Sequence, residues 1–352
     1  MAAIISYFYG TNSAGIQIKY YIVENRSGAR VVLSQLGASV VSVIVPDKNG
    51  KMRDVVLGYK GIGGYETDGA YFGATVGRCC GRIRNGKFKL NGQEFNLPIN
   101  NGPNHLHEGI KSFSRRVWDS RVDGDDVIFT LNVPDGDEGY PGRVRVRLIY
   151  TLTEDNTLML DYTADTDADT PLNLTNHVYF NLNGCDGEDV CNHFLRIFAE
   201  EYTPVTDRLV PTGEYASVSG TSIDFRDFRS IGDALKGEDA CMSYTGGVDH
   251  NFVLAHERRP FSEAAVAYSP DTGIRITCCT DLPGVQVYTG NFLDEKGGKY
   301  GLSWEKYHGF CLETQFFANS VNEPRFPSII LKKGDVFTSR TTYRVDKVGE
   351  GE

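Results

Sequence analysis

The chain has 352 residues, of which 40% are hydrophobic, so it can form a large core and general disorder is excluded. Its formal net charge of −10 argues against nucleic acid as a partner and is easier to reconcile with a neutral or cationic small molecule. No run of about 18 apolar residues occurs, so we expect no transmembrane helix and no membrane partner.

Strand patterns dominate the first half of the chain. Residues 15–23, 38–45 and 54–59 are rich in β-branched and aromatic residues. Segments 87–90 and 93–97 flank Asn91-Gly92, which predicts a hairpin because Asn and Gly accept positive φ at both turn positions. Three further strands are predicted at 127–133, 143–152 and 157–164.

The second half continues this pattern with one short helix near 228–235. We predict strands at 194–198, 251–255, 264–268, 275–280, 284–289, 309–316 and 336–343. No linker, shift of composition or internal repeat divides the chain. The sequence therefore predicts an all-β fold, a large antiparallel β-sandwich, organised as one domain over residues 1–352.

The ends and the cysteines indicate a cytoplasmic protein. The N-terminus lacks the basic region and long apolar stretch of a signal peptide, and the C-terminus carries no retention or peroxisomal signal. The eight cysteines include no C-x-x-C pair, so we expect reduced, buried thiols that form neither a disulfide nor a metal site.

Residues 171–184, PLNLTNHVYFNLNG, alternate as a strand does. One face is apolar apart from Asn176, for which we expect a structural hydrogen bond. The other face carries His177 at the centre of the polar residues Asn173, Thr175, Tyr179 and Asn181. We interpret this polar face as one wall of a ligand cleft, although a histidine on such a face can also be a purely structural hydrogen-bond partner.

Glu313 lies in the middle of a second strand, GFCLETQF, with apolar residues on the opposite face. A carboxylate in so apolar a strand should be paired, hydrogen-bonded or catalytic. If this strand and His177 line one cleft, the two side chains form a candidate general base and general acid.

Three loop segments supply further candidates. His105 and His107 stand two residues apart and could ligate a metal, but no carboxylate or cysteine accompanies them, so we do not assign one. Arg82 either binds a ligand or pairs with surface acids. Asp249 enters a predicted strand and could cap a turn.

Taken together, these blocks resemble the aldose 1-epimerase family, also called galactose mutarotase. The resemblance rests on NHVYFNL and on seven further blocks in the family's order: GRCCGRIRNGKF, NNGPNHLHEG, PDGDEGYPG, TPVTDRLVPTGE, GVDHNFVL, LPGVQVYTGNFL and CLETQFFANSVNEPRFPSIILKKGD. It implies the galactose mutarotase-like supersandwich. It also implies a monosaccharide partner, no metal and no organic cofactor.

The resemblance further implies that the protein interconverts the α and β anomers of free aldoses such as galactose and glucose. Glu313 takes the role of base and His177 that of acid. His107 stabilises charge near the ring oxygen or C1, whereas Arg82 and Asp249 hold sugar hydroxyls. Gln286 and Tyr179 are further candidates for the same pocket.

The sequence departs from the family at three places. Gly81 replaces a usual Asn, Glu108 a usual Gly, and Phe316 a frequent His. The loss of Asn implies one polar contact fewer to the sugar. Two alternatives stay open: a hexose-6-phosphate 1-epimerase, which needs a cationic cluster for phosphate, and a non-catalytic sugar-binding module on the same fold. We expect a monomer or a weak homodimer.

Overall fold

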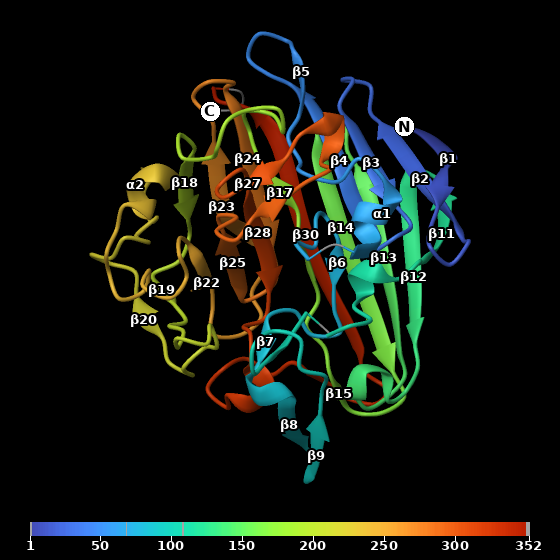
Figure 1. Ribbon diagram of the computed structural model, residues 1–352, viewed down its shortest axis with the longest axis vertical. Helices are drawn as coiled ribbons and strands as arrows, with labels where there is room; N and C mark the ends of the chain where they lie inside the picture. The colour runs from blue at the N-terminus through green and yellow to red at the C-terminus, as the bar shows by residue number, and fades with distance from the viewer. Residues whose placement is uncertain (1, 68, 108, 350–352) are drawn as a thin grey trace.

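The computed structural model describes residues 2–67, 69–107 and 109–349, and nearly all of its regular structure is β-strand (Figure 1). Neighbouring strands within its sheets are antiparallel, as predicted. The first large sheet contains the N-terminal strands in sequence order: β1 (Ala3–Thr11), β2 (Gln17–Glu24), β3 (Arg30–Ser34), β4 (Ser39–Pro46) and β5 (Met52–Asp54).

Two further sheets mix strands from distant parts of the chain. The nine-stranded sheet has the order β11 (Asp119–Asp123), β12 (Asp126–Val133), β13 (Val144–Leu152), β14 (Thr157–Thr166), β30 (Val336–Lys347), β24 (Ile274–Thr280), β23 (Ser262–Tyr268), β18 (Phe194–Ile197) and β21 (Arg229–Ser230). The six-stranded sheet has the order β17 (Tyr179–Phe180), β28 (Phe310–Gln315), β25 (Gly284–Tyr288), β22 (Asp249–Val253), β19 (Glu201–Tyr202) and β20 (Ala216–Ser217).

Short elements complete the fold. The two-stranded pairs are β6 (Thr75–Val76) with β16 (Thr175–Asn176), β7 (Arg82–Ile83) with β10 (His105–Leu106), β8 (Lys87–Leu90) with β9 (Gln93–Asn96), β15 (Thr170–Pro171) with β29 (Ile330–Leu331), and β26 (Asp294–Glu295) with β27 (Trp304–Glu305). The helices are α1 (Ile62–Thr67) and α2 (Ile231–Leu235), with 3₁₀ turns at Arg84–Gly86, Phe113–Arg115, Asp137–Gly139, Lys299–Gly301 and Ser320–Asn322. No helix among the described residues is long and apolar enough to cross a membrane.

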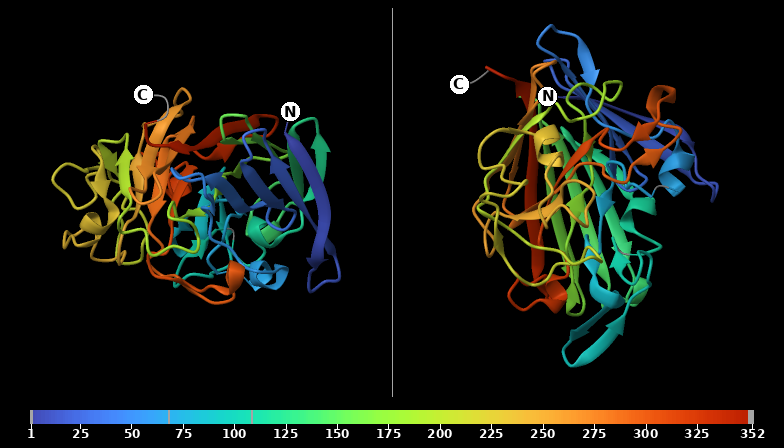
Figure 2. Two further views of the ribbon diagram at one scale, coloured as in Figure 1. Left: turned by 90° about the horizontal axis from the view of Figure 1, so that it is seen from above. Right: turned by 60° about the vertical axis from the view of Figure 1, so that its left-hand side comes forward.

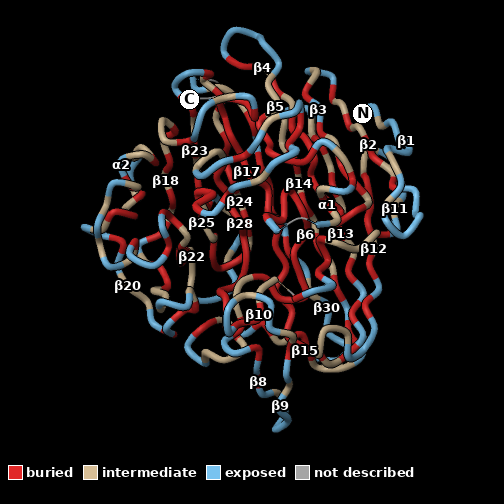
Figure 3. Tube along the Cα trace, viewed as in Figure 1, coloured by how far each residue is buried: buried red, intermediate tan, exposed pale blue. Residues whose placement is uncertain are grey.

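The core lies between the sheets, because alternate residues of each strand face inward. In β13, Val144, Val146 and Leu148 are fully buried while Arg145 is exposed. Figure 2 shows the N-terminal strands and α2 at opposite ends of the molecule, and Figure 3 shows the long central strands buried between them.

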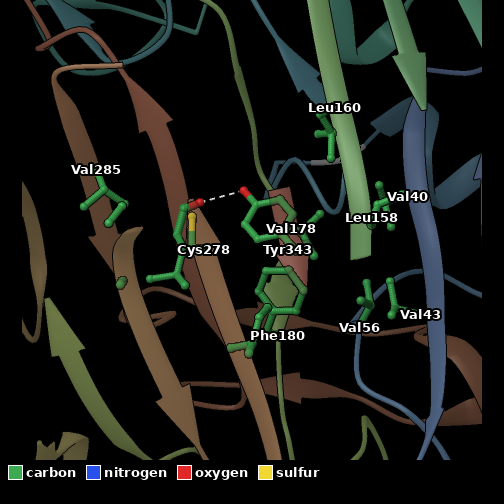
Figure 4. Packing of buried hydrophobic residues seen from close by; sticks show 14 of the residues in the cluster. Val40, Val43, Val56, Leu158, Leu160, Val178, Phe180, Cys278, Val285 and Tyr343 are labelled. Atoms are coloured by element: carbon green, nitrogen blue, oxygen red, sulfur yellow. Dashed lines mark hydrogen bonds between the residues drawn. The ribbon is translucent and has the colours of Figure 1, made fainter. Parts of the chain in front are cut away.

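Packing and side-chain hydrogen bonds hold the sheets against each other. Figure 4 shows Val40 and Val43 of β4 next to Leu158 of β14 in this core. The Tyr343 hydroxyl of β30 donates to the carbonyl of Leu312 in β28 at 2.7 Å. The strand that carries Glu313 is therefore fixed to the nine-stranded sheet from behind.

Most predicted strands are confirmed, and local turn chemistry explains the clearest case. In the hairpin of β8 and β9, Asn91 and Gly92 have φ values of 50° and 79°, as the Asn-Gly turn requires. The predicted helix is confirmed but starts later, at Ile231, where the side chain of Ser230 accepts a hydrogen bond from the amide of Asp233.

Two strand predictions are wrong. In residues 54–59 only Asp54 belongs to a strand, and Val56 and Tyr59 form isolated bridges. Residues 171–184 are not one strand either, because irregular residues divide them and β15, β16 and β17 pair with three different partners, β29, β6 and β28. The strands β1, β3 and β11 were not predicted; β1 is exposed on both faces, which removes the alternation that marks a strand.

Candidate active site

A cavity of about 430 Å³ lies against one face of the six-stranded sheet. All seven residues predicted for the site line it: Arg82, His107, His177, Tyr179, Asp249, Gln286 and Glu313. Five of them come from five different strands, whereas His107 and His177 lie in two separate connecting segments, and the set spans more than two hundred positions of the sequence. The structure thus brings the predicted residues together.

Strand register places the central side chains. Gln286 of β25 pairs directly with Glu313 of β28, and Tyr179 of β17 pairs with Cys311. Since side chains alternate along a strand, Cys311, Glu313 and Gln315 share one face while Phe310 and Leu312 point into the core. The polar face of β28 that the sequence predicted is confirmed, and Glu313 and Gln315 line the cavity.

His177 and Glu313 form the centre of the site. Nε2 of His177 lies 3.6 Å from Oε1 of Glu313, and the two residues are only 5% and 3% exposed. Burial raises the pKa of Glu313 well above its usual range; the nearby Asp249 raises it further and Arg82 opposes this. Burial lowers the pKa of His177 to about 4. Both pKa shifts favour an uncharged pair, in which the one titratable proton lies on the carboxyl group of Glu313 and the imidazole of His177 is neutral.

His107 is fixed as a neutral hydrogen-bond donor. Its backbone has a φ of 49°, and its Nδ1 accepts a hydrogen bond from the amide of Gly81 at 3.2 Å. Burial, together with His177 and Arg82, keeps its pKa well below the usual value. The proton of the neutral ring therefore lies on Nε2, which can donate it into the site.

Two hydrogen bonds orient the remaining polar side chains. Nε of Arg82 donates to Oδ1 of Asn101 at 3.0 Å, and Oδ1 of Asp249 accepts from Nε2 of Gln286 at 2.6 Å. The ring of Tyr179 stacks on His177 with centroids 5.0 Å apart. These contacts hold donors and acceptors in place around the central pair, an arrangement suited to a small polyhydroxylated ligand.

The interpretation of the polar face of residues 171–184 as a cleft wall is wrong for most of its members. Only His177 and Tyr179 of that row are among the residues that line the cavity. The amide of Asn173 instead bonds the backbone of Phe316 through both its atoms, at 2.8 and 2.9 Å, and Asn181 donates to two backbone carbonyls. The hydrogen bond expected of Asn176 is confirmed, since its Nδ2 donates to the Gly73 carbonyl at 3.0 Å.

The second loop histidine, His105, and the three positions that depart from the family pattern lie in different surroundings. Both ring nitrogens of His105 are used within the protein, one with the Pro98 carbonyl at 2.7 Å and one with the Tyr140 hydroxyl at 2.9 Å, so His105 is structural. At position 81 a Cβ atom would lie 2.5 Å from that of Ala318, so this backbone accommodates glycine. Phe316 is buried, and Glu108 lies outside the described residues.

Other residues of the cavity were not predicted. Asn251 follows Asp249 by two positions on β22, so extending the alternation from Asp249 would have found it. Tyr71 contacts both histidines, with ring centroids 4.7 Å from His107 and 5.9 Å from His177. It lies in a loop with positive φ, and no sequence pattern marks it.

Comparisons with known proteins identify related sequences and structures. The sequence profile of the family described as Aldose 1-epimerase matches residues 19–344. Galactose mutarotase from Bos taurus is 42% identical over 316 residues, which cover 90% of each chain, and aldose 1-epimerase from Escherichia coli K12 is 34% identical over 92% of this chain and 93% of its own. Among solved structures, an aldose epimerase homologue from C. elegans has a TM-score of 0.86 at 31% identity, covering 99% of this chain and 100% of its own.

Proposed function

This chain belongs to the aldose 1-epimerase family, and from that premise we propose that it interconverts the α and β anomers of free aldohexoses, with galactose and glucose as the first sugars to test. The observation that carries the proposal is the buried pair of His177 and Glu313, 3.6 Å apart at the base of a cavity that also contains fixed donors and acceptors. Anomer exchange needs one group that takes a proton and one that gives a proton, which is the capacity of such a pair.

In the proposed reaction, Glu313 removes the proton from the C1 hydroxyl while His177 protonates the ring oxygen. The bond between C1 and the ring oxygen breaks, and C1 becomes an aldehyde. Rotation about the C1–C2 bond turns the other face of the aldehyde to the oxygen. Closure then reverses both proton transfers, so the protein ends in its starting state.

The proton inventory of the pair supports this cycle. A protonated Glu313 with a neutral His177 carries the same one proton as an ionised Glu313 with a protonated His177. Sugar binding therefore needs no proton from solvent, because transfer within the pair produces the base and the acid together. Arg82 favours the ionised form of Glu313, as its opposing effect on the pKa of that carboxyl group indicates.

The other residues would hold the sugar. We assign to the neutral His107 a hydrogen bond from Nε2 to the oxygen on which charge develops, and to Arg82 and Asp249 the binding of ring hydroxyls. Gln286 would extend this set from beside Asp249, and the ring of Tyr179 would support His177. Such fixed groups lower the barrier by positioning rather than by further proton transfer.

We also propose that residues 1–352 act as one domain in a reducing compartment, the cytoplasm. One cluster of buried residues extends from Tyr21 to Val345, and the eight cysteines are free thiols. We keep monomer or weak homodimer as the expected state; sedimentation equilibrium tests it.

Polarimetry on freshly dissolved α-D-galactose and α-D-glucose tests the proposed function. We expect faster mutarotation with the protein than without it. A folded protein that gives no acceleration would refute the proposal, and a response limited to hexose 6-phosphates would replace the substrate class.

A further inference from the structure

Behind the central pair lies a thiol that the proposed reaction does not use. The side chain of Cys311 is completely buried on the same face of β28 as Glu313, and its Sγ is 3.5 Å from Nδ1 of His177. Taking one ligand atom from each of His177, Cys311 and Glu313, the three atoms all lie within 4.8 Å of one another. An imidazole, a thiol and a carboxyl group thus converge at the base of the cavity.

We propose that this base is also a binding site for a thiophilic divalent cation, Zn²⁺ or Cd²⁺, with the imidazole of His177, the thiolate of Cys311 and the carboxylate of Glu313 as ligands. Because two of these ligands are the acid and the base of the proposed reaction, a bound cation would inhibit it and compete with the sugar. The inhibition rests on the proposed function, whereas the binding of the cation does not.

The separation of the sulfur and nitrogen ligands fits a tetrahedral ion. With Zn–S at about 2.3 Å and Zn–N at about 2.0 Å, a tetrahedral site separates sulfur from nitrogen by about 3.5 Å. The observed separation of Cys311 Sγ and His177 Nδ1 is 3.5 Å. The carboxylate of Glu313 lies nearer to Nε2, at 3.6 Å, so it has to shift toward Nδ1; it is the ligand on the longest and most rotatable of the three side chains.

The ligand set also selects the kind of cation. Mg²⁺ and Ca²⁺ prefer six or more oxygen ligands, whereas a set of sulfur, nitrogen and one carboxylate suits Zn²⁺ and Cd²⁺. The Cys311 thiol is completely buried, and a cation has to displace its proton to bind the sulfur, which favours an ion with high affinity for thiolate. The cavity gives access, because His177 and Glu313 line it in front of Cys311.

Cobalt(II), a spectroscopic substitute for zinc, tests the site without any sugar. Titration of the wild-type protein with Co²⁺ should produce the near-ultraviolet charge-transfer band of a thiolate–cobalt bond, and Zn²⁺ should bleach it. Cys311→Ser should remove the band and weaken Zn²⁺ binding in calorimetry by more than the roughly 10–100-fold that loss of an outer-shell partner costs. Absence of the band from the wild-type protein overturns the proposal even if the variant fails to fold.

Cys80 provides a matched control. It is another buried thiol beside the cavity, with Sγ 3.1 Å from Oε1 of Gln315, but it does not belong to the cluster of three ligands. Cys80→Ala should keep the cobalt band, and loss of the band in this variant would overturn the assignment to Cys311.

Polarimetry tests the predicted inhibition. Zn²⁺ should inhibit competitively with galactose, whereas Mg²⁺ at the same concentration should have no effect; Zn²⁺ inhibition that galactose does not relieve would also overturn the proposal. A cobalt band in a protein without mutarotase activity would leave the cation site standing and refute the proposed function alone.

Discussion

The most direct test of the roles proposed for His177 and Glu313 is a double-mutant cycle. Glu313→Gln keeps the shape of the side chain but removes the group that accepts the proton, and His177→Asn removes the group that donates it. The structure places these two groups 3.6 Å apart. We call the two groups a relay if each proton transfer requires the other. In that case either substitution alone stops catalysis by the pair, and the second substitution lowers the rate little further.

The magnitudes separate the two possibilities. Loss of general acid or base catalysis typically lowers a rate by about 10²–10⁴-fold, or about 3–5 kcal/mol of transition-state stabilisation. Two independent groups would multiply to about 10⁴–10⁸-fold in the double variant. We expect instead that the double variant is slower than the worse single variant by less than about tenfold, because the proton transfers at O1 and at the ring oxygen depend on each other.

The assay is polarimetric mutarotation of α-D-galactose at several concentrations, which gives kcat and KM for each variant. Thermal unfolding shows whether a variant is folded. Glu295→Gln is a matched control: this carboxylate is also at the cavity but accepts a hydrogen bond from the Tyr59 hydroxyl at 2.7 Å, and its loss should change the rate far less. Single variants that retain wild-type kcat, or effects that multiply fully, would refute the relay.

Three further predictions follow from groups near the pair and from the core. The pair of His177 and Glu313 gains a second titratable proton below the His177 pKa of about 4 and loses its one titratable proton above the raised pKa of Glu313. A plot of kcat/KM against pH should therefore fall on the acidic side and on the alkaline side and be flat between them. Asn173→Ala removes the hydrogen-bond partners of the buried N–H and C=O of Phe316, and each unsatisfied group costs about 1–3 kcal/mol. Urea denaturation should therefore show a free energy of unfolding lower by about 2–6 kcal/mol, and an unchanged midpoint would contradict this. Burial lowers the pKa of His193 to about 3, so the unfolded state takes up the proton first and the free energy of unfolding should decrease as pH falls below about 6.5. Buried His177 contributes in the same direction, so His193→Gln should make that dependence less steep without removing it, and an equal slope in both proteins would refute the prediction.

Local chemistry explains which features the sequence could predict. The hairpin at Asn91-Gly92 depends only on two residues that tolerate positive φ, so its turn and its strands were predictable. Residues 171–184 show the limit. Their alternation identified the buried residues, but a side-chain amide such as that of Asn173 can replace a strand in pairing with a distant backbone, and no local pattern reveals that partner.

The site itself depends on register, which a single sequence does not contain. Glu313 meets His177 only because β28 pairs with β17 through Tyr179 and Cys311 and with β25 through Gln286. A shift of one residue along β28 would turn the carboxylate into the core and bring Leu312 to the cavity. The alternating pattern predicts that Glu313 and His177 each face away from the apolar side of their segments, and the resemblance to a known family supplied the expectation that they face each other. Phe310 and Leu312, which this register turns into the core, make it the stable one, and the proposed site uses the face that remains.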